Sequence, residues 1–248
     1  MKTVESIATQ LWNTGFDNFA DDRGARKLAV VLVTVDVLLI VIHVLKYFFK
    51  DEFIALFGYW IYRNLTITND MAIPEITNYL KFAVTVFLLI RIFGAVRQPV
   101  YLAWAFVYGL ALIDDSMRVH EQLGSLFSEW LAGDTFLGLT VEGGEGFRAQ
   151  DAGEMIVYAL YGGCFAVVLG LGFLLSEPLH RTIGFSFALL LGGLVFFVAV
   201  FDIFDRFVAA VSQYAGRVLS TLEDGGEMIV VSLTVAFTVS VYRRFRVS

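Results

Sequence analysis

Long apolar runs are the feature that most constrains how this chain can fold. A helix needs about 20 mostly apolar residues to cross the hydrocarbon core of a bilayer. Runs of this kind lie at about residues 28–49, 78–97, 99–120, 153–176, 181–205 and 223–242. Composition agrees, because 58% of the 248 residues are hydrophobic and only 17% are charged, whereas a soluble domain carries roughly a quarter charged residues. We therefore predict an all-α, polytopic membrane helical bundle of about six spans, forming a single membrane domain over residues 1–248.

Basic clusters flank the first and the last predicted span. They consist of Arg23, Arg26 and Lys27 before the first span and of Arg243, Arg244 and Arg246 after the last. The positive-inside rule places both clusters in the cytoplasm, and an even number of spans puts both termini on one side. We expect an integral membrane protein of the bacterial inner membrane with cytoplasmic N- and C-termini.

A repeated pentapeptide predicts that the second half of the chain is duplicated. Gly-Glu-Met-Ile-Val occurs at residues 153–157 and again at 226–230, each time at the head of an apolar run. We predict that residues 98–176 and 177–248 form two helical hairpins, which make a tandem parallel repeat around a pseudo-twofold axis. Glu154 and Glu227, the glutamates of the two copies, would then face each other near the outer surface.

The first part of the chain is predicted to combine two spans with two interfacial segments. Residues 1–27 place apolar side chains at helical spacing, which indicates an amphipathic helix on the inner membrane surface. Residues 28–97 hold the first two spans. Aromatic side chains in the connecting stretch 51–75 predict a second interfacial segment, on the outer surface.

Carboxylates gather at one predicted depth, near the outer ends of all four helices of the duplicated hairpins. Charged groups at membrane depth are costly and usually mark a site. Residues four apart share a helix face, so Asp114 is expected to pair with Arg118, and Asp202 with Arg206. Two arginines cannot balance all of these carboxylates. The excess must be solvated, protonated or neutralised by a bound cation.

A divalent cation is the leading explanation of this excess, because oxygen-rich sites with one imidazole suit hard or borderline divalent ions. The predicted ligands are Asp115, His120, Glu121, Glu154, Asp202, Asp205, Glu223 and Glu227. The choice among Mn, Fe, Ca and Zn stays open, as does a structural, catalytic or transport role. We expect no nucleotide cofactor and no haem, since neither a glycine-rich nucleotide loop nor a suitable histidine pair is found. The net charge of −6 argues against a nucleic-acid partner.

Three short motifs resemble those of a loose group of uncharacterised bacterial multispanning membrane proteins. They are Asp-Asp-x-x-x-x-His-Glu from Asp114 to Glu121, Glu-Asp-Gly-Gly-Glu from Glu223 to Glu227, and the stretch from Asn69 to Glu75. The resemblance supports the positions of the predicted site and implies no function.

Two other classes of function stay open. The amphipathic N-terminus, an acidic outer loop and 24 phenylalanines fit a non-catalytic accessory subunit, packed in the bilayer against other membrane proteins or copies of itself. A cation- or proton-coupled carrier would need a path that continues inward through Asp36, with His43 as a further member. Lys81 and Arg91 are expected to extend along the lipid toward the two membrane surfaces.

Overall fold

The computed structural model describes residues 16–69, 71–131, 149–201, 204 and 212–246, together with two short strands between 135 and 140. In this part of the chain, six helices are long and apolar enough to cross a membrane. The chain is therefore an integral membrane protein. Residues 1–15 of the predicted amphipathic N-terminus lie outside the described residues.

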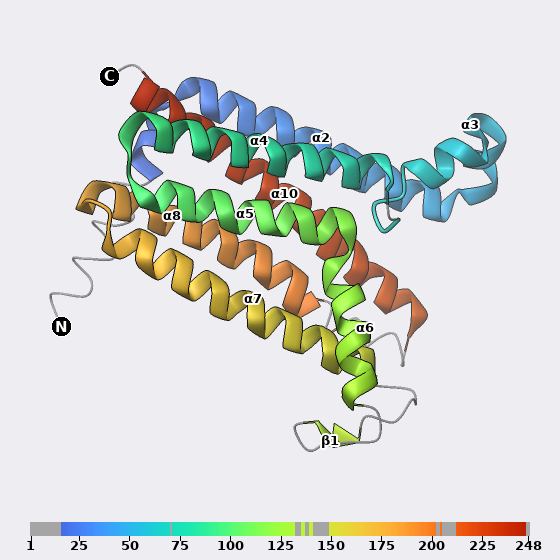
Figure 1. Cartoon of the computed structure of the whole chain (residues 1–248). Helices are drawn as coiled ribbons and strands as arrows, with labels where there is room; N and C mark the ends of the chain where they lie inside the picture. Colours follow the sequence, from blue (N-terminus) through green and yellow to red (C-terminus); the bar gives the residue numbers. More distant parts are fainter. Residues whose placement is uncertain are drawn as a thin grey trace, which may run out of the picture.

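Helices account for almost all of the described chain (Figure 1). In chain order they are α2 (Arg23–Phe48), α3 (Lys50–Asn64), α4 (Ile73–Val96), α5 (Pro99–Met117), α6 (Val119–Leu131), α7 (Ala149–Leu174), α8 (Pro178–Val195), the π-helical η1 (Phe196–Phe201) and α10 (Gln213–Arg246). Strands β1 (Thr135–Phe136) and β2 (Leu139–Thr140) pair antiparallel. The predicted spans correspond to α2, α4, α5, α7, α8 with η1, and α10.

Three of the helices begin at prolines, and these are the only prolines in the sequence. Pro74, Pro99 and Pro178 lie in the first turns of α4, α5 and α8. The first turn is where a helix tolerates proline, since its missing N–H would have no intrahelical partner there. The prolines therefore fix where the chain re-enters the bundle after each turn.

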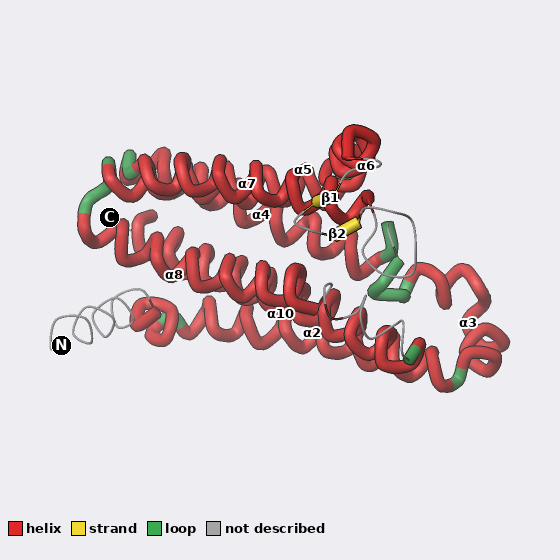
Figure 2. Tube along the Cα trace, turned by 90° about the horizontal axis from the view of Figure 1, so that it is seen from below, coloured by secondary structure: helices red, strands yellow, loops and turns green. Residues whose placement is uncertain are grey.

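Helix α10 occupies the centre of the bundle. Within its apolar stretch 72% of the residues are buried, against 11% for α2 and 11% for α7. It packs against α2, α4, α8 and η1, and Figures 1 and 2 show it between these helices. An aromatic contact joins it to α8, since the ring centroids of Phe187 and Phe237 lie 4.9 Å apart. Phe187 also contacts Trp104 of α5, with ring centroids 5.9 Å apart.

The third span ends earlier than predicted. Arg118 adopts a left-handed conformation with φ 52° and ψ 45°, which ends α5 at Met117. The chain then turns into α6 (Figure 1), so the predicted single helix over 99–120 is wrong. Helix α6 packs closely on α7 through two glycines, because a Cβ on Gly153 would collide with the carbonyl oxygen of Gly124.

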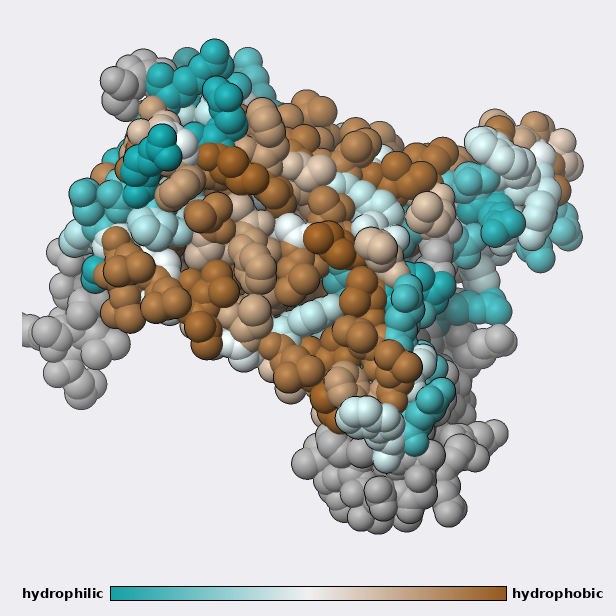
Figure 3. All heavy atoms as spheres, in the orientation of Figure 1, coloured by the Kyte–Doolittle hydropathy of each residue, from teal (hydrophilic) through white to brown (hydrophobic). Residues whose placement is uncertain are grey.

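The two ends of the bundle differ in charge. At one end, which we call the basic end, α2 begins and α10 ends: Arg243 pairs with Asp22 at 3.2 Å, and Asn18 donates to Ser240 at 3.1 Å. At the other, acidic end, α5 finishes and α7 starts, with α3 beyond them (Figure 1). Figure 3 shows hydrophobic surface over the middle of the bundle and hydrophilic surface toward its ends, as expected for a membrane-spanning body.

Candidate functional site

A buried ion pair joins three helices inside the bundle. Lys81 of α4 donates to Asp36 of α2 over 2.6 Å, and the two side chains are only 9% and 1% exposed. The second oxygen of Asp36 accepts a hydrogen bond from Ser232 of α10 over 2.5 Å. Lys81 also donates to Asn78 Oδ1 at 3.1 Å and to the carbonyl of Met228 at 3.4 Å. Each charge therefore faces its counter-charge and has further hydrogen-bond partners from the protein.

The pair lies well inside the membrane. At a rise of about 1.5 Å per residue, Asp36 is roughly 20 Å along α2 from Arg23 and Lys81 is about 12 Å into α4. The expectation that Lys81 extends along the lipid to a membrane surface is therefore wrong. A buried carboxylate without a cation is strongly unfavourable, and Asp36 lies within reach of the ammonium group, so the lysine turns inward.

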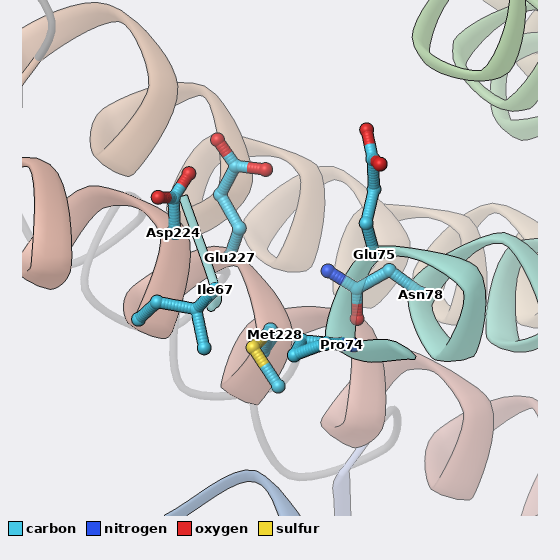
Figure 4. A pocket seen from close by; sticks show the side chains of 7 residues that line it. All are labelled: Ile67, Pro74, Glu75, Asn78, Asp224, Glu227 and Met228. Atoms are coloured by element: carbon cyan, nitrogen blue, oxygen red, sulfur yellow. The ribbon is translucent and has the colours of Figure 1, made fainter. Parts of the chain in front are cut away.

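An acidic cavity lies directly next to the pair, toward the acidic end. Its volume is about 30 Å³, close to the share of one liquid water. It is lined by Ile67, Pro74, Glu75, Asn78, Asp224, Glu227 and Met228 (Figure 4). Asn78 faces the cavity and also accepts from Lys81, so a single amide separates the cavity from the ion pair. Asp224, Asp115 and Glu223 lie close enough to Glu227 to act on it electrostatically, so carboxyl groups crowd this wall of the cavity.

A second acid–base pair holds the junction of α5, α6 and α7. Asp114 Oδ2 lies 2.9 Å from His120 Nδ1, while Asp114 Oδ1 accepts from the His120 backbone N–H at 2.8 Å and from the Tyr161 hydroxyl at 2.9 Å. The His120 ring stacks on Tyr158, with centroids 5.5 Å apart. Burial by itself lowers the pKa of His120, but the hydrogen bond and charge of Asp114, with further carboxylates nearby, raise it above its ordinary value.

The predicted ion pairs are placed differently from the sequence expectation. Arg118 binds Glu121, with Nε–Oε1 at 2.9 Å and Nη2–Oε2 at 2.7 Å. Asp114 is occupied by His120 and Tyr161. The physical reason is the left-handed residue at Arg118, which removes the continuous helix face that the i, i+4 argument requires. Asp202, Asp205 and Arg206 lie outside the described residues, so their predicted pairing and ligand roles stay predictions.

The predicted metal ligands that the structure describes fall into two groups. His120, Glu121 and Glu154 lie at the α5–α6–α7 junction, where Glu154 accepts from Gln150 at 2.9 Å. Glu227 lines the acidic cavity, and Asp115 and Glu223 lie close enough to act on it electrostatically. Among described residues, no group of three or more His, Cys, Asp or Glu side chains has a metal-binding arrangement.

His43, predicted as part of a proton path, binds the segment that covers the cavity. Its Nδ1 accepts the backbone N–H of Ile67 at 3.3 Å, and Ile67 lines the cavity. Lys46, one turn further along α2, is 2% exposed and donates to Thr66 and to the carbonyl of Tyr62. These contacts fasten the end of α3 to α2 beside the cavity.

The repeated pentapeptide contributes close packing in both copies. Gly153 is in contact with Gly124, and a Cβ on Gly226 would collide with the Phe197 ring of η1. The glutamates that follow have different surroundings, since Glu154 is buried against Gln150 and Glu227 lines the acidic cavity. The pentapeptide therefore marks two tight helix contacts and two distinct carboxylates.

Sequence reasoning missed Asn78, Ser232 and Tyr161, which complete the two acid–base pairs. Ser232 could have been found from the sequence, because hydroxyl residues recur in the last apolar run. Hydroxyl side chains on membrane spans often hydrogen-bond between helices. The buried hydroxyls of this run are Ser232, Thr234, Thr238 and Ser240. Asn78 and Tyr161 carry no comparable signal, because each gains its role only from the neighbouring helix.

Two buried polar atoms in the aromatic core have no hydrogen-bond partner within the described part of the chain. They are Trp104 Nε1 and the Tyr108 hydroxyl on α5. Thr234 of α10 lies close enough to act on Tyr108. Buried polar atoms normally find a protein or water partner, so these two atoms are exceptions within the aromatic core.

Comparison with known proteins identifies one family. A family model described as Domain of unknown function (DUF8692) matches residues 31–241. No curated protein and no solved structure matches the chain. The matched range runs from within α2 to near the end of α10, so it contains both acid–base pairs and the acidic cavity.

Proposed function

We propose a proton-coupled carrier function for this chain, which belongs to the family described as Domain of unknown function (DUF8692). The observation that carries the proposal is the Asp36–Lys81 pair at membrane depth, one amide away from an acidic cavity. Ionisable residues inside membrane spans are rare, and they mark ion paths and proton relays. A buried ion pair is in itself weak support for a structural role, because hydrophobic residues of similar volume are often as stable.

The pair has the chemistry that coupling requires. When Asp36 takes up a proton, the Lys81 ammonium group loses its counter-charge. Asn78 and the Met228 carbonyl already accept from the same ammonium group, so they favour its turning toward the cavity. A proton bound on Asp36 would thereby change the electrostatics of the cavity and the contacts between α2, α4 and α10.

The acidic cavity is the proposed entrance. Glu75, Asp224 and Glu227 concentrate cations near its wall, and its volume suits a water or hydronium that bridges to Asn78. On the other side of the pair, Ser232 begins a series of buried hydroxyls along α10 toward the basic end. Tyr108 and Trp104 offer further polar atoms beside this series. This arrangement supports a path inward through Asp36.

Orientation follows from the positive-inside rule. We place the basic end in the cytoplasm of a bacterial cell and the acidic cavity toward the outer side of the inner membrane. The proton would then enter from the outside, which is the direction that a cellular proton gradient drives. The tandem repeat of the two hairpins remains part of this proposal, as the origin of the paired glutamates.

Proton flux in liposomes tests the role of Asp36 directly. Reconstituted wild-type protein should move protons down an imposed gradient, and Asp36→Asn should abolish that movement. Asp17→Asn, the same change at an exposed position, should retain it. A flux that is identical in wild type and Asp36→Asn would contradict the proposal.

A bound divalent cation is the second candidate, favoured by the same cavity. Glu75, Asp224 and Glu227 line the cavity with oxygen atoms of the kind that such ions prefer, and an ion would have to draw these side chains together, since the described residues form no ready three-ligand group. Metal analysis of the purified protein should find about one ion per chain, lost in Glu227→Gln and kept in Glu129→Gln, a change at an exposed glutamate of α6. Wild-type protein that holds far less than one ion would reject this candidate and leave the proton proposal intact.

A further inference from the structure

An open groove lies at the basic end of the bundle, along the first turns of α2. Its volume is about 510 Å³, and it is lined by Arg23, Arg26, Lys27, Val30 and Val31. These positions follow the spacing i, i+3, i+4, i+7, i+8, so they share one face of the helix. The face carries cations at its beginning and exposed aliphatic side chains one turn further in.

The three cations have no acidic partner within the described part of the chain. The nearest carboxylate in sequence, Asp22, is already used: it accepts from the Ala25 N–H at 2.9 Å and pairs with Arg243 at 3.2 Å. Cations in the first turn also oppose the helix dipole, which favours anions there. Both facts leave the positive charge of this face uncompensated by the described residues.

The aliphatic part of the groove indicates which anion. Val30 and Val31 are 66% and 58% exposed, and they lie roughly 10–12 Å along the helix from Arg23. A phosphate held at the cations would place an attached hydrocarbon chain along the valines. An inorganic anion would leave the valines uncovered. A zwitterionic headgroup would place its own positive charge next to the arginines.

We propose that this groove binds one anionic glycerophospholipid, with its phosphate at Arg23, Arg26 and Lys27 and an acyl chain along Val30 and Val31. The proposal does not depend on the carrier function. The ligand would brace the first turns of α2, whose neighbouring residue Asp22 is in turn attached to the end of α10 through Arg243.

Native mass spectrometry tests this site. The protein is released from nanodiscs that contain equal amounts of phosphatidylglycerol and phosphatidylcholine, and the retained lipids are counted. The wild type should retain phosphatidylglycerol preferentially. The double variant Arg23→Gln with Arg26→Gln should lose that retention by roughly tenfold or more. The matched control Arg91→Gln with Arg97→Gln removes two cations outside the groove and should keep it.

A second variant tests the shape of the groove without changing its charge. Val31→Trp fills the aliphatic part and should reduce retention of phosphatidylglycerol as the double variant does. It also decides the matter if the double variant fails to fold. Equal retention of the two lipids by the wild type would overturn the proposal, as would unchanged retention in both Val31→Trp and the double variant.

Two further results would assign the groove to another occupant and overturn the proposal. Soluble glycerol phosphate that displaces the lipid at equal concentration would show a phosphate site without an acyl requirement. Efficient disulfide formation in membranes between Val31→Cys and Ile7→Cys would show that the chain's own N-terminal segment fills the groove. Low crosslinking together with weak competition by glycerol phosphate supports the lipid.

Discussion

Asp36 and Asp114 bind similar partners in very different surroundings. Each carboxylate meets one basic side chain and one hydroxyl: Lys81 and Ser232 for the first, His120 and Tyr161 for the second. The Asp36–Lys81 side chains are 1% and 9% exposed, whereas the Asp114–His120 side chains are 14% and 21% exposed. The first pair joins helices distant in sequence, and the second joins three consecutive helices at the edge of the bundle.

The difference in exposure determines how each pair can respond. A sealed pair at membrane depth responds only when a proton or cation is delivered to it, which suits coupling. A half-buried pair with a histidine can follow the pH of the adjoining water. We therefore expect loss of the inner pair to affect the whole bundle, and loss of the outer pair to affect the junction of α5, α6 and α7.

The largest effect is expected from breaking the inner pair. Asp36→Asn leaves Lys81 buried without a counter-charge, and removal of one partner of a buried pair costs about 3–5 kcal/mol. Unfolding by denaturant in detergent should show this loss, while Asp17→Asn should leave stability unchanged. The double variant Asp36→Asn with Lys81→Met should recover most of it. A double variant as unstable as the single one would contradict the assignment of the cost to the unpaired lysine.

A smaller effect is expected from separating α6 and α7, which disturbs only the outer pair. Gly153→Ala places a methyl group against the Gly124 carbonyl, and such overpacking costs about 1–3 kcal/mol. Gly162→Ala is the matched control, because a Cβ there has no neighbour within 4 Å. Histidine NMR should show a shifted His120 resonance in Gly153→Ala and unchanged His43 and His180 resonances. A disturbed His43 would show that the two regions are coupled.

The two hydroxyls give a direct comparison of the surroundings. Ser232→Ala leaves a buried carboxylate oxygen without its donor, which should cost about 1.5–3 kcal/mol. Tyr161→Phe removes the equivalent donor from Asp114, where water can replace it, and should cost about 0.5 kcal/mol. Thermal unfolding of both variants in one detergent measures the difference. Equal losses would show that the outer pair is as sealed as the inner one.

The spans were predictable from sequence because their signals are local. Apolar length located all six helices, and prolines mark three of their starts. The beginning of α10 was missed by ten residues, since Gln213 to Leu222 is too polar to resemble a span and is helical nevertheless. The break at Arg118 was also missed. Helix ends are normally signalled by glycine or proline, and here an arginine adopts the left-handed conformation.

The pairing of the charges could not be predicted in the same way. Asp36 and Lys81 are both conspicuous in apolar runs, yet which helices are neighbours is a property of the packed bundle. The carboxylates do gather at the acidic end, but the turn at Arg118 separates Glu121 and His120 from Asp115. Three expectations stay predictions: the pseudo-twofold arrangement, the metal site and the accessory-subunit interpretation. The first two depend partly on residues between 202 and 211 that lie outside the described chain.

A modest effect is expected in the pH dependence of the outer pair. The pKa of His120 is raised in the folded protein, mainly by Asp114, which outweighs the opposing effect of burial. A raised folded-state pKa means that the pair stabilises the protein fully below the unfolded-state pKa and loses this contribution as pH rises through the folded-state value. The stability difference between wild type and His120→Gln should therefore be larger at about pH 5 than at about pH 9, by on the order of 1 kcal/mol.

The inner pair provides the contrast for that measurement. The double variant Asp36→Asn with Lys81→Met removes no histidine, so it serves as the reference for the same comparison at the two pH values. Unfolding curves for the three proteins at both pH values decide the matter. A His120→Gln difference that grows with pH would mean that the imidazole is held neutral beside Asp114, and the contrast between the two aspartates would then rest on burial alone.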